Sequence, residues 1–268
     1  MENLQLILPE IFISLSIMFL LIFGVFKKNS SEIIQNLSLL VLLVTAVIVF
    51  NETLDVKKIT LFNGGVIIDY LSSLMKIITL LAAFIVLVIS KSYLKIFKIF
   101  KIEYPILILS SVLGMMIMIS SNDLMVFYMG LELQSLALYV LATFNRDQLK
   151  SSEAGLKYFV LSALSSGLLL YGCSLIYGFS GSTNFDVIAN ELNSNEYVLT
   201  FGIVFILVGL SFKISAVPFH MWAPDVYEGS PTSVTLFFTI VPKIAALTVF
   251  IRFLYVPFLN LIDQWQMI

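Results

Sequence analysis

Two lysines interrupt apolar stretches that are long enough to cross a lipid bilayer. Lys213 lies within GLSFKISAVPF and Lys243 within TLFFTIVPKIAAL, and both belong to Val208–Ala246. On insertion scales, a charged lysine at the centre of a membrane helix costs about 2.5–3.5 kcal/mol of free energy. Two such residues in consecutive apolar stretches therefore predict a path for protons or other cations through a membrane protein.

A glutamate lies at a similar depth in an earlier apolar stretch. Glu132 follows eight residues of Leu124–Phe144, about 13 Å from the start of a helix that rises about 1.5 Å per residue. Burial favours the neutral forms of carboxylate and ammonium groups, whereas a nearby opposite charge favours the ionised forms. We therefore predict that Glu132 and Lys213 form a proton-holding pair. The alternatives are a glutamate hydrogen-bonded for packing alone and a purely structural ion pair.

The residues after Lys213 predict a broken helix. Pro218 has no N–H to donate, and its ring clashes with the carbonyl of Ile214. Broken helices at membrane depth line protein or water cavities, and their ends form ion sites in transporters. His220 follows the break and is a candidate for relaying protons near neutral pH. The alternative is a structural histidine.

Lys243 and Lys157 are further candidates for the proton path. Lys243 follows Pro242 about midway along Thr232–Tyr255, and its alternative role is a packing ion pair. Lys157 lies near the inner end of Ala154–Phe179, where its side chain could equally extend to the membrane surface. A close helix–helix interface is predicted by the small residues that follow. These are Ser162, Ala163, Ser165, Ser166 and Gly167.

Three other residues are assigned to the edges of the membrane. Lys76 is predicted to extend to the membrane surface or to pair with Asp69, and the alternative is a functional role. Trp222 and Tyr227 are predicted to be interfacial anchors.

The composition is typical of a membrane protein. The 268 residues are 59% hydrophobic and 12% charged, whereas soluble domains are about 25% charged. One cysteine, Cys173, and one histidine exclude a disulfide framework, an iron–sulfur site and a Cys/His zinc site built by this chain alone. No glycine-rich phosphate motif follows a strand-like run, and a net charge of −2 does not indicate a nucleic-acid partner. Redox chemistry is therefore expected on other chains.

A helical span needs about 20 mainly apolar residues, and eight stretches meet this need. They predict an all-α polytopic membrane bundle of about eight transmembrane helices. The stretches are roughly Pro9–Phe26, Ile33–Phe50, Ile67–Ser90, Tyr104–Ser120, Leu124–Phe144, Ala154–Phe179, Tyr197–Val217 and Thr232–Tyr255. The polar Asn51–Ile68 segment, with its Gly64-Gly65 pair, predicts an external hairpin.

Basic residues in the loops predict the orientation of the bundle. The loops after the first, third and fifth stretches contain Lys27, Lys28, Lys91, Lys95, Lys98, Lys101, Arg146 and Lys150. Those after the second, fourth and sixth contain Lys57 and Lys58. The positive-inside rule then puts the first set on the cytoplasmic or matrix side and the N-terminus on the periplasmic or intermembrane side. Acidic Glu2 and Glu10 flank the first stretch, which is expected to be a retained helix rather than a signal peptide.

Several segments together resemble a known family. GLSFKISAVPFHMWAPDVYEGSPTSVTLFFTIVPKIAAL, NDLMVFYMGLELQSLALYVLATF, LKSSEAGLKYFVLSALSSGLLLYG and YGFSGSTNF resemble the antiporter-like subunit N, also called subunit 2, of proton-pumping NADH:quinone oxidoreductase (respiratory complex I). The resemblance runs from about Tyr104 to Leu247, with specific spacing.

The resemblance implies a fold with a discontinuous seventh helix that breaks around Pro218, and the first of two inverted helix repeats. The expected organisation is a three-helix membrane segment over residues 1–103, a five-helix repeat over 104–255, and the start of a next segment over 256–268. The second repeat would belong to a separate chain or to a missing part of a longer one.

By position, the resemblance makes Glu132 and Lys213 the coupled pair and Lys213 the central proton carrier. Lys157 and Lys243 become relay residues. It implies a non-redox subunit of an NADH:quinone reductase, in a mitochondrial or bacterial inner membrane, with other membrane-arm subunits as partners. NAD, FMN, iron–sulfur clusters and quinone are expected on those other subunits. The alternatives are a subunit of a multi-subunit cation/proton antiporter and a purely structural assembly subunit.

Overall fold

The computed structural model describes residues 6–27, 30–53, 58–191 and 196–266. The long helices are α2 (Leu8–Phe26), α3 (Ser31–Thr53), α4 (Tyr70–Ile96), α5 (Glu103–Ile119), α6 (Leu124–Ala142), α7 (Leu149–Ser180), α9 (Glu196–Ile214) and α11 (Thr232–Tyr255). Short elements connect them or follow them: strands β1 (Ile59–Leu61) and β2 (Val66–Ile68), and helices α8 (Phe185–Glu191), α10 (Ala223–Gly229), η1 (Leu259–Leu261) and α12 (Ile262–Trp265).

The all-α membrane fold is confirmed. In the described part of the chain, α2, α3, α4, α6, α7 and α11 are each long and apolar enough to cross a membrane, and α5 and α9 are shorter apolar helices. Each predicted stretch therefore overlaps one helix. The total of eight crossings and the three-segment organisation stay predictions.

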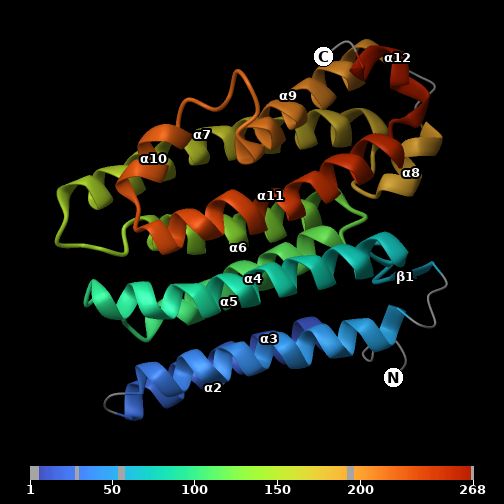
Figure 1. Ribbon diagram of the computed structural model, residues 1–268. Coiled ribbons are helices and arrows are strands. Elements are labelled where there is room, and N and C mark those ends of the chain that lie inside the picture. Colours follow the sequence, from blue (N-terminus) through green and yellow to red (C-terminus); the bar gives the residue numbers. More distant parts are fainter. Residues whose placement is uncertain (1–5, 28–29, 54–57, 192–195, 267–268) are drawn as a thin grey trace.

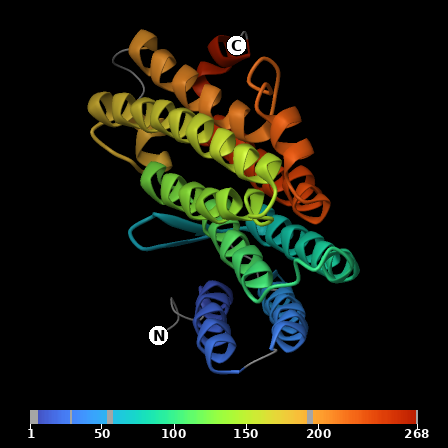
Figure 2. The same cartoon turned by 90° about the vertical axis from the view of Figure 1, so that its left-hand side faces the viewer.

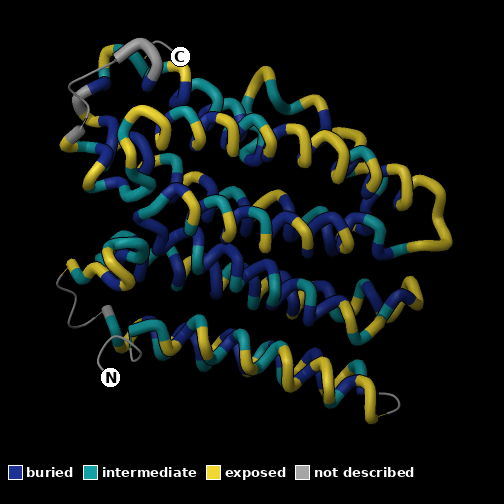
Figure 3. Tube along the Cα trace, turned by 180° about the vertical axis from the view of Figure 1, so that it is seen from behind, coloured by how far each residue is buried: buried dark blue, intermediate teal, exposed yellow. Residues whose placement is uncertain are grey.

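The helices lie roughly parallel in layers (Figure 1). Helices α2 and α3 form one edge, α7 and α9 form the opposite edge, and the other long helices lie between them (Figure 2). Helix α11 packs against α4 and α5 as well as α6 and α9, so it ties the N-terminal helices to the later ones. Buried residues gather in the inner layers, whereas the edge helices expose much of their surface (Figure 3).

The two ends of the bundle differ. The end of α2, the start of α3 and the connections α4–α5 and α6–α7 are at the same end as α10 (Figure 1). The predicted hairpin is confirmed and lies at the other end, with β1 and β2 paired antiparallel and Ile59 opposite Ile68. It is attached to the end of α5 by a hydrogen bond of 2.8 Å from Ile67 N–H to Ser120 O.

Two pairs of glycines bring neighbouring helices into backbone contact. A Cβ on Gly114 of α5 would lie 2.8 Å from the Gly130 carbonyl oxygen of α6, and a Cβ on Gly172 of α7 would lie 2.7 Å from the Gly202 oxygen of α9. Such approaches are closer than side chains allow. They fix α6 and α9, which carry Glu132 and Lys213, against their neighbours.

Candidate proton-transfer site

Helix α9 ends directly after Lys213. The Ala216 N–H donates to Ser211 O at 2.9 Å, the Ser215 N–H donates to Phe212 O at 3.1 Å, and Ser215 has a φ of 64°. This is the Schellman pattern, in which a left-handed residue closes the helix. Because the carbonyl end of a helix carries partial negative charge, it favours a cation in its last turn.

The Lys213 ammonium group is held by hydroxyl groups of two other helices. Lys213 is 8% exposed, and its Nζ donates to Ser135 Oγ of α6 at 2.8 Å and to Ser162 Oγ of α7 at 2.6 Å. The Tyr139 hydroxyl donates to the same Ser162 oxygen at 2.7 Å. The Tyr139 ring lies 5.9 Å from Lys213 Nζ, within cation–π range. The buried amine therefore has neutral partners.

Glu132 lies one helical turn before Ser135 on the same helix. Its charge acts on Lys213, but within the described ranges Lys213 forms hydrogen bonds rather than an ion pair. Glu132 Oε1 is buried and has no hydrogen-bond partner among the described residues. The structure thus brings the two residues into one region, with a free carboxylate oxygen beside the amine's hydroxyl partners.

Trp222 is buried behind the end of α9, so its predicted interfacial position is wrong. It is 5% exposed, and its indole N–H donates to Phe212 O at 3.0 Å. Its ring stacks on Tyr158 at 4.7 Å and on Phe212 at 5.4 Å between centroids. Stacking and the hydrogen bond together hold the segment between α9 and α10 against α7. His220 lies in this segment, and its Nδ1 is buried without a hydrogen-bond partner among the described residues.

Lys243 lies on α11, next to α10 rather than next to Lys213. Its Nζ is 5.7 Å from the centre of the Tyr227 ring, and Tyr227 in turn contacts Trp222 edge to face at 5.8 Å. Successive ring contacts through Trp222, Tyr158 and Tyr139 therefore connect the surroundings of the two lysines. The Tyr227 hydroxyl is buried without a partner among the described residues.

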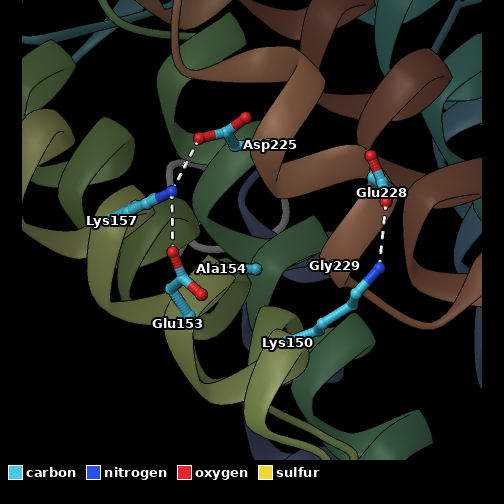
Figure 4. Close-up of a pocket in the computed structure, with 7 residues that line it drawn as sticks. All are labelled: Lys150, Glu153, Ala154, Lys157, Asp225, Glu228 and Gly229. Carbon is cyan, nitrogen blue, oxygen red and sulfur yellow. Dashed lines mark hydrogen bonds and ion pairs between the residues drawn. The ribbon is translucent and has the colours of Figure 1, made fainter.

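Lys157 lies in a charged pocket between α7 and α10. Its Nζ is 2.7 Å from Asp225 Oδ2 and 2.8 Å from Glu153 Oε1, and its side chain is 41% exposed. Lys150 and Glu228 form a second bridge across the same pocket at 3.2 Å (Figure 4). Lys157 therefore lies at the α10 end of the bundle, where its partners are exposed carboxylates. It is not among the residues that contact Lys213.

The predicted pairing of Lys76 with Asp69 is wrong. Asp69 caps the start of α4 and pairs with Arg252 of α11 at 2.8 Å, whereas Lys76 pairs with Glu10 of α2. Burial raises the pKa of Asp69, but the Arg252 charge and hydrogen bonds from Ser72 outweigh it and leave that pKa below its usual value. Arg252 is 3% exposed, and sequence reasoning missed it because it lies near the end of an apolar stretch.

Sequence reasoning also missed the hydroxyl groups that hold Lys213. The sequence predicted for Ser162 only a role in close helix packing, as one of several small residues. It predicted no role for Ser135 or Tyr139. Both nevertheless follow Glu132 at a helical spacing that puts all three residues on one face of α6.

These features define a class of protein: a helical membrane protein with a buried lysine in the last turn of an apolar helix. A family model described as NADH:quinone oxidoreductase/Mrp antiporter, transmembrane, matches residues 121–268. The chain belongs to this family.

Comparisons over the whole chain agree. The chain is 77% identical to NADH-quinone oxidoreductase subunit N of Pelagibacter ubique, over 99% of this chain and 56% of that protein. A chain of respiratory complex I from Thermus thermophilus has a TM-score of 0.79 and 30% identity, over 91% of this chain and 52% of that one. A chain of a membrane-bound sulfane sulfur reductase, an archaeal respiratory membrane complex, has a TM-score of 0.82 over 97% of this chain and 56% of that one. Its identity is 22%, so it shows the fold alone. The chain spans about half the length of the curated relatives it matches.

Proposed function

We propose that this chain belongs to a membrane-arm subunit of NADH:quinone oxidoreductase and forms part of a proton pathway coupled to quinone reduction. The main observation in support of this proposal is that the Lys213 amine is buried at the end of α9 and donates hydrogen bonds to hydroxyl groups of α6 and α7. Support for the complex comes from relatives named NADH-quinone oxidoreductase subunit N.

In the proposed mechanism, movement of the Glu132 charge controls the proton on Lys213. At an effective dielectric constant of about 20, unit charges about 4 Å apart interact by about 4 kcal/mol. This corresponds to nearly a thousandfold change in proton occupancy. Glu132 and Lys213 are not in an ion pair here, so a closer approach of the carboxylate would stabilise the ammonium form. Its withdrawal would release the proton.

Lys243 is the proposed next carrier, with Tyr227 and His220 beside the route. No hydrogen bond joins the two lysines within the described residues, so a transfer between them needs water or a side-chain rotation. Lys157 is proposed as a relay at the α10 end, where its two carboxylate partners face the charged pocket.

The proposed subunit contributes no redox site of its own. NAD, FMN, iron–sulfur clusters and quinone are assigned to other subunits, and the partners are the lipid bilayer, other membrane-arm subunits and the second helix repeat. The bacterial relatives favour a bacterial inner membrane over the mitochondrial one. The lysine-rich end would then face the cytoplasm and the N-terminus the periplasm.

The second candidate is a subunit of a cation/proton antiporter, because the matching family model covers both kinds of protein. A sodium-dependent proton flux without quinone would favour it. The structural alternative, in which the buried charges only fix helix packing, predicts that Lys213→Ala and Glu132→Gln damage assembly as much as activity.

The test is a complex that contains the full-length subunit with Lys213→Ala, reconstituted in proteoliposomes. Proton uptake and NADH:quinone turnover are followed together, with Lys101→Ala as a control for an exposed lysine. We expect an assembled complex that loses both activities, whereas the control keeps them. Full pumping and turnover in the Lys213→Ala complex would refute the proposal.

A further inference from the structure

A polar cavity lies at the α10 end of the bundle, between the start of α3 and the connection from α4 to α5 (Figure 1). Its volume is about 240 Å³. Two serines, one lysine and one glutamate line it together with two apolar residues: Ser30, Ser31, Lys101, Glu103, Phe100 and Ile102. The cavity lies outside residues 121–268, which the family model matches, and it contains none of the residues of the proposed proton path.

The start of α3 supplies hydrogen-bond donors to this cavity. The Ile34 N–H donates to the Ser30 oxygen at 2.9 Å, and the N–H groups that precede Ile34 have no acceptor within the helix. A serine at this position usually accepts a hydrogen bond from one of them. The Ser30 hydroxyl is instead buried without a partner among the described residues. A free hydroxyl and free N–H groups at the positive end of a helix are suited to binding a phosphate group.

Two opposite charges line the cavity without being paired. Lys101 and Glu103 are both exposed, and within the described residues neither takes part in an ion pair. Glu32, in the first turn of α3, pairs with Lys95, so its charge is compensated. The cavity therefore offers a cation beside the helix donors and a separate carboxylate that is free to accept from an amine.

Apolar side chains are exposed on the helix ends that lead to the cavity. They are Val25 and Phe26 of α2, before Ser30, and Ile96 and Phe97 at the end of α4, before Phe100. Helices α2 and α4 are each long and apolar enough to cross a membrane. Aromatic residues and lysines at the ends of such helices lie at the level of the lipid headgroups. This places the cavity at headgroup depth, with apolar surface towards the membrane interior.

We propose that this cavity binds a phospholipid with a phosphoethanolamine headgroup. The phosphate accepts hydrogen bonds from Lys101, from the Ser30 hydroxyl and from the N–H groups at the start of α3, and the ammonium group donates to Glu103. A zwitterion matches the two opposite charges of the lining. A phosphoglycerol headgroup would leave Glu103 without a cation, and a phosphocholine headgroup has no N–H to donate.

Photo-crosslinking of the intact complex with the full-length subunit tests this proposal. The complex is placed in nanodiscs that contain a phospholipid probe with a diazirine on the acyl chain near the headgroup, and cross-linked peptides are identified by mass spectrometry. Three probes with the same chains carry phosphoethanolamine, phosphocholine or phosphoglycerol. We expect the ethanolamine probe to label peptides from the end of α2 and the α4–α5 connection about tenfold more than the other probes, as one charge-assisted hydrogen bond would give.

Variants of the lining test the role of each charge. Lys101→Met should lower labelling by the ethanolamine probe about tenfold, because the phosphate loses its cation. Glu103→Gln should remove the advantage of the ethanolamine probe over the glycerol probe. Lys98→Met is the matched control, because Lys98 is exposed in the same connection but does not line the cavity. Labelling of this control should equal that of the unmodified complex.

Three results would overturn the proposal. They are equal labelling by the three probes, unchanged labelling in Lys101→Met, and loss of labelling when inorganic phosphate is added in excess. The last result would show that the cavity takes free phosphate rather than a lipid. Because the readout is lipid labelling rather than pumping, failure here is distinct from failure of the Lys213 proposal.

Discussion

Replacing Gly172 with alanine tests whether the contact between α7 and α9 holds Lys213 in place. The new Cβ would lie 2.7 Å from Gly202 O, whereas ordinary contact begins at 3.4 Å. The helices would have to separate locally by about 0.7 Å, the difference between these distances. Overpacking of this kind typically costs about 1–3 kcal/mol. The same shift, if transmitted along the helices, would take the 2.6 Å bond from Lys213 to Ser162 to about 3.3 Å, beyond the usual range.

The assay compares two alanine variants of the same helix in the assembled complex. Thermal denaturation gives the stability, and proteoliposomes give proton uptake per NADH oxidised. A Cβ on Gly167 would meet no atom within 4 Å, so Gly167→Ala is the matched control. Alanine is favoured over glycine within a helix by about 0.5–1 kcal/mol. We expect Gly167→Ala to be at least as stable as the unmodified complex, and Gly172→Ala to lose stability and proton uptake.

Two results would refute this reasoning. Equal stability of the two variants would show that the glycine contact between α7 and α9 does not limit their separation. A Gly172→Ala complex that is less stable but pumps normally would show that helix spacing does not set the contacts of Lys213.

The remaining predictions concern the polar contacts. Ser162→Ala should reduce proton uptake by about tenfold to a hundredfold with assembly intact, because a hydrogen bond from a charged donor contributes about 1.5–3 kcal/mol; coupled uptake and turnover measure it. Asp69→Asn should destabilise the complex by about 3–5 kcal/mol at neutral pH, because buried Arg252 loses its partner. The pKa of Asp69 is lowered, so its stabilisation is present above the usual aspartate pKa and is lost as the pH falls through the lowered value; denaturation at stepped pH measures this. Lys157→Met should leave assembly unchanged, because its ion pairs are exposed, and should lower proton uptake.

Each of these predictions has a control and a contrary result. Ser166 Oγ is buried without a partner among the described residues, so Ser166→Ala should be neutral; equal losses in both serine variants would contradict a specific role for Ser162. A destabilisation by Asp69→Asn that persists unchanged in acid would contradict the ion-pair explanation. Normal uptake in Lys157→Met would leave Lys157 as a surface ion pair and remove it from the path.

The helices and the helix end after Lys213 follow from local sequence. A run of apolar residues in a bilayer must satisfy its backbone hydrogen bonds internally, which makes it a helix whatever its neighbours are. Pro218 cannot donate a backbone hydrogen bond, and α9 ends at Ile214, four residues earlier. The same local signals predicted the Gly64-Gly65 hairpin.

The partners of the charged residues were decided by the tertiary structure. Lys76 lies seven residues from Asp69, yet it pairs with Glu10 on another helix, and Asp69 pairs with Arg252, 183 residues later. Trp222 has the sequence character of an interfacial anchor, but the return of the chain after α9 buries it against Tyr158.

The sequence by itself determined that the chain forms apolar helices with charges inside them, because hydrophobicity and proline chemistry act over a few residues. It did not determine that Lys213 is held by Ser135 and Ser162 while Glu132 keeps a free oxygen. Those contacts depend on the rotation and spacing of three helices. Backbone contact at residues such as Gly172 and Gly202 sets that spacing, and such contact exists only once distant segments have packed together.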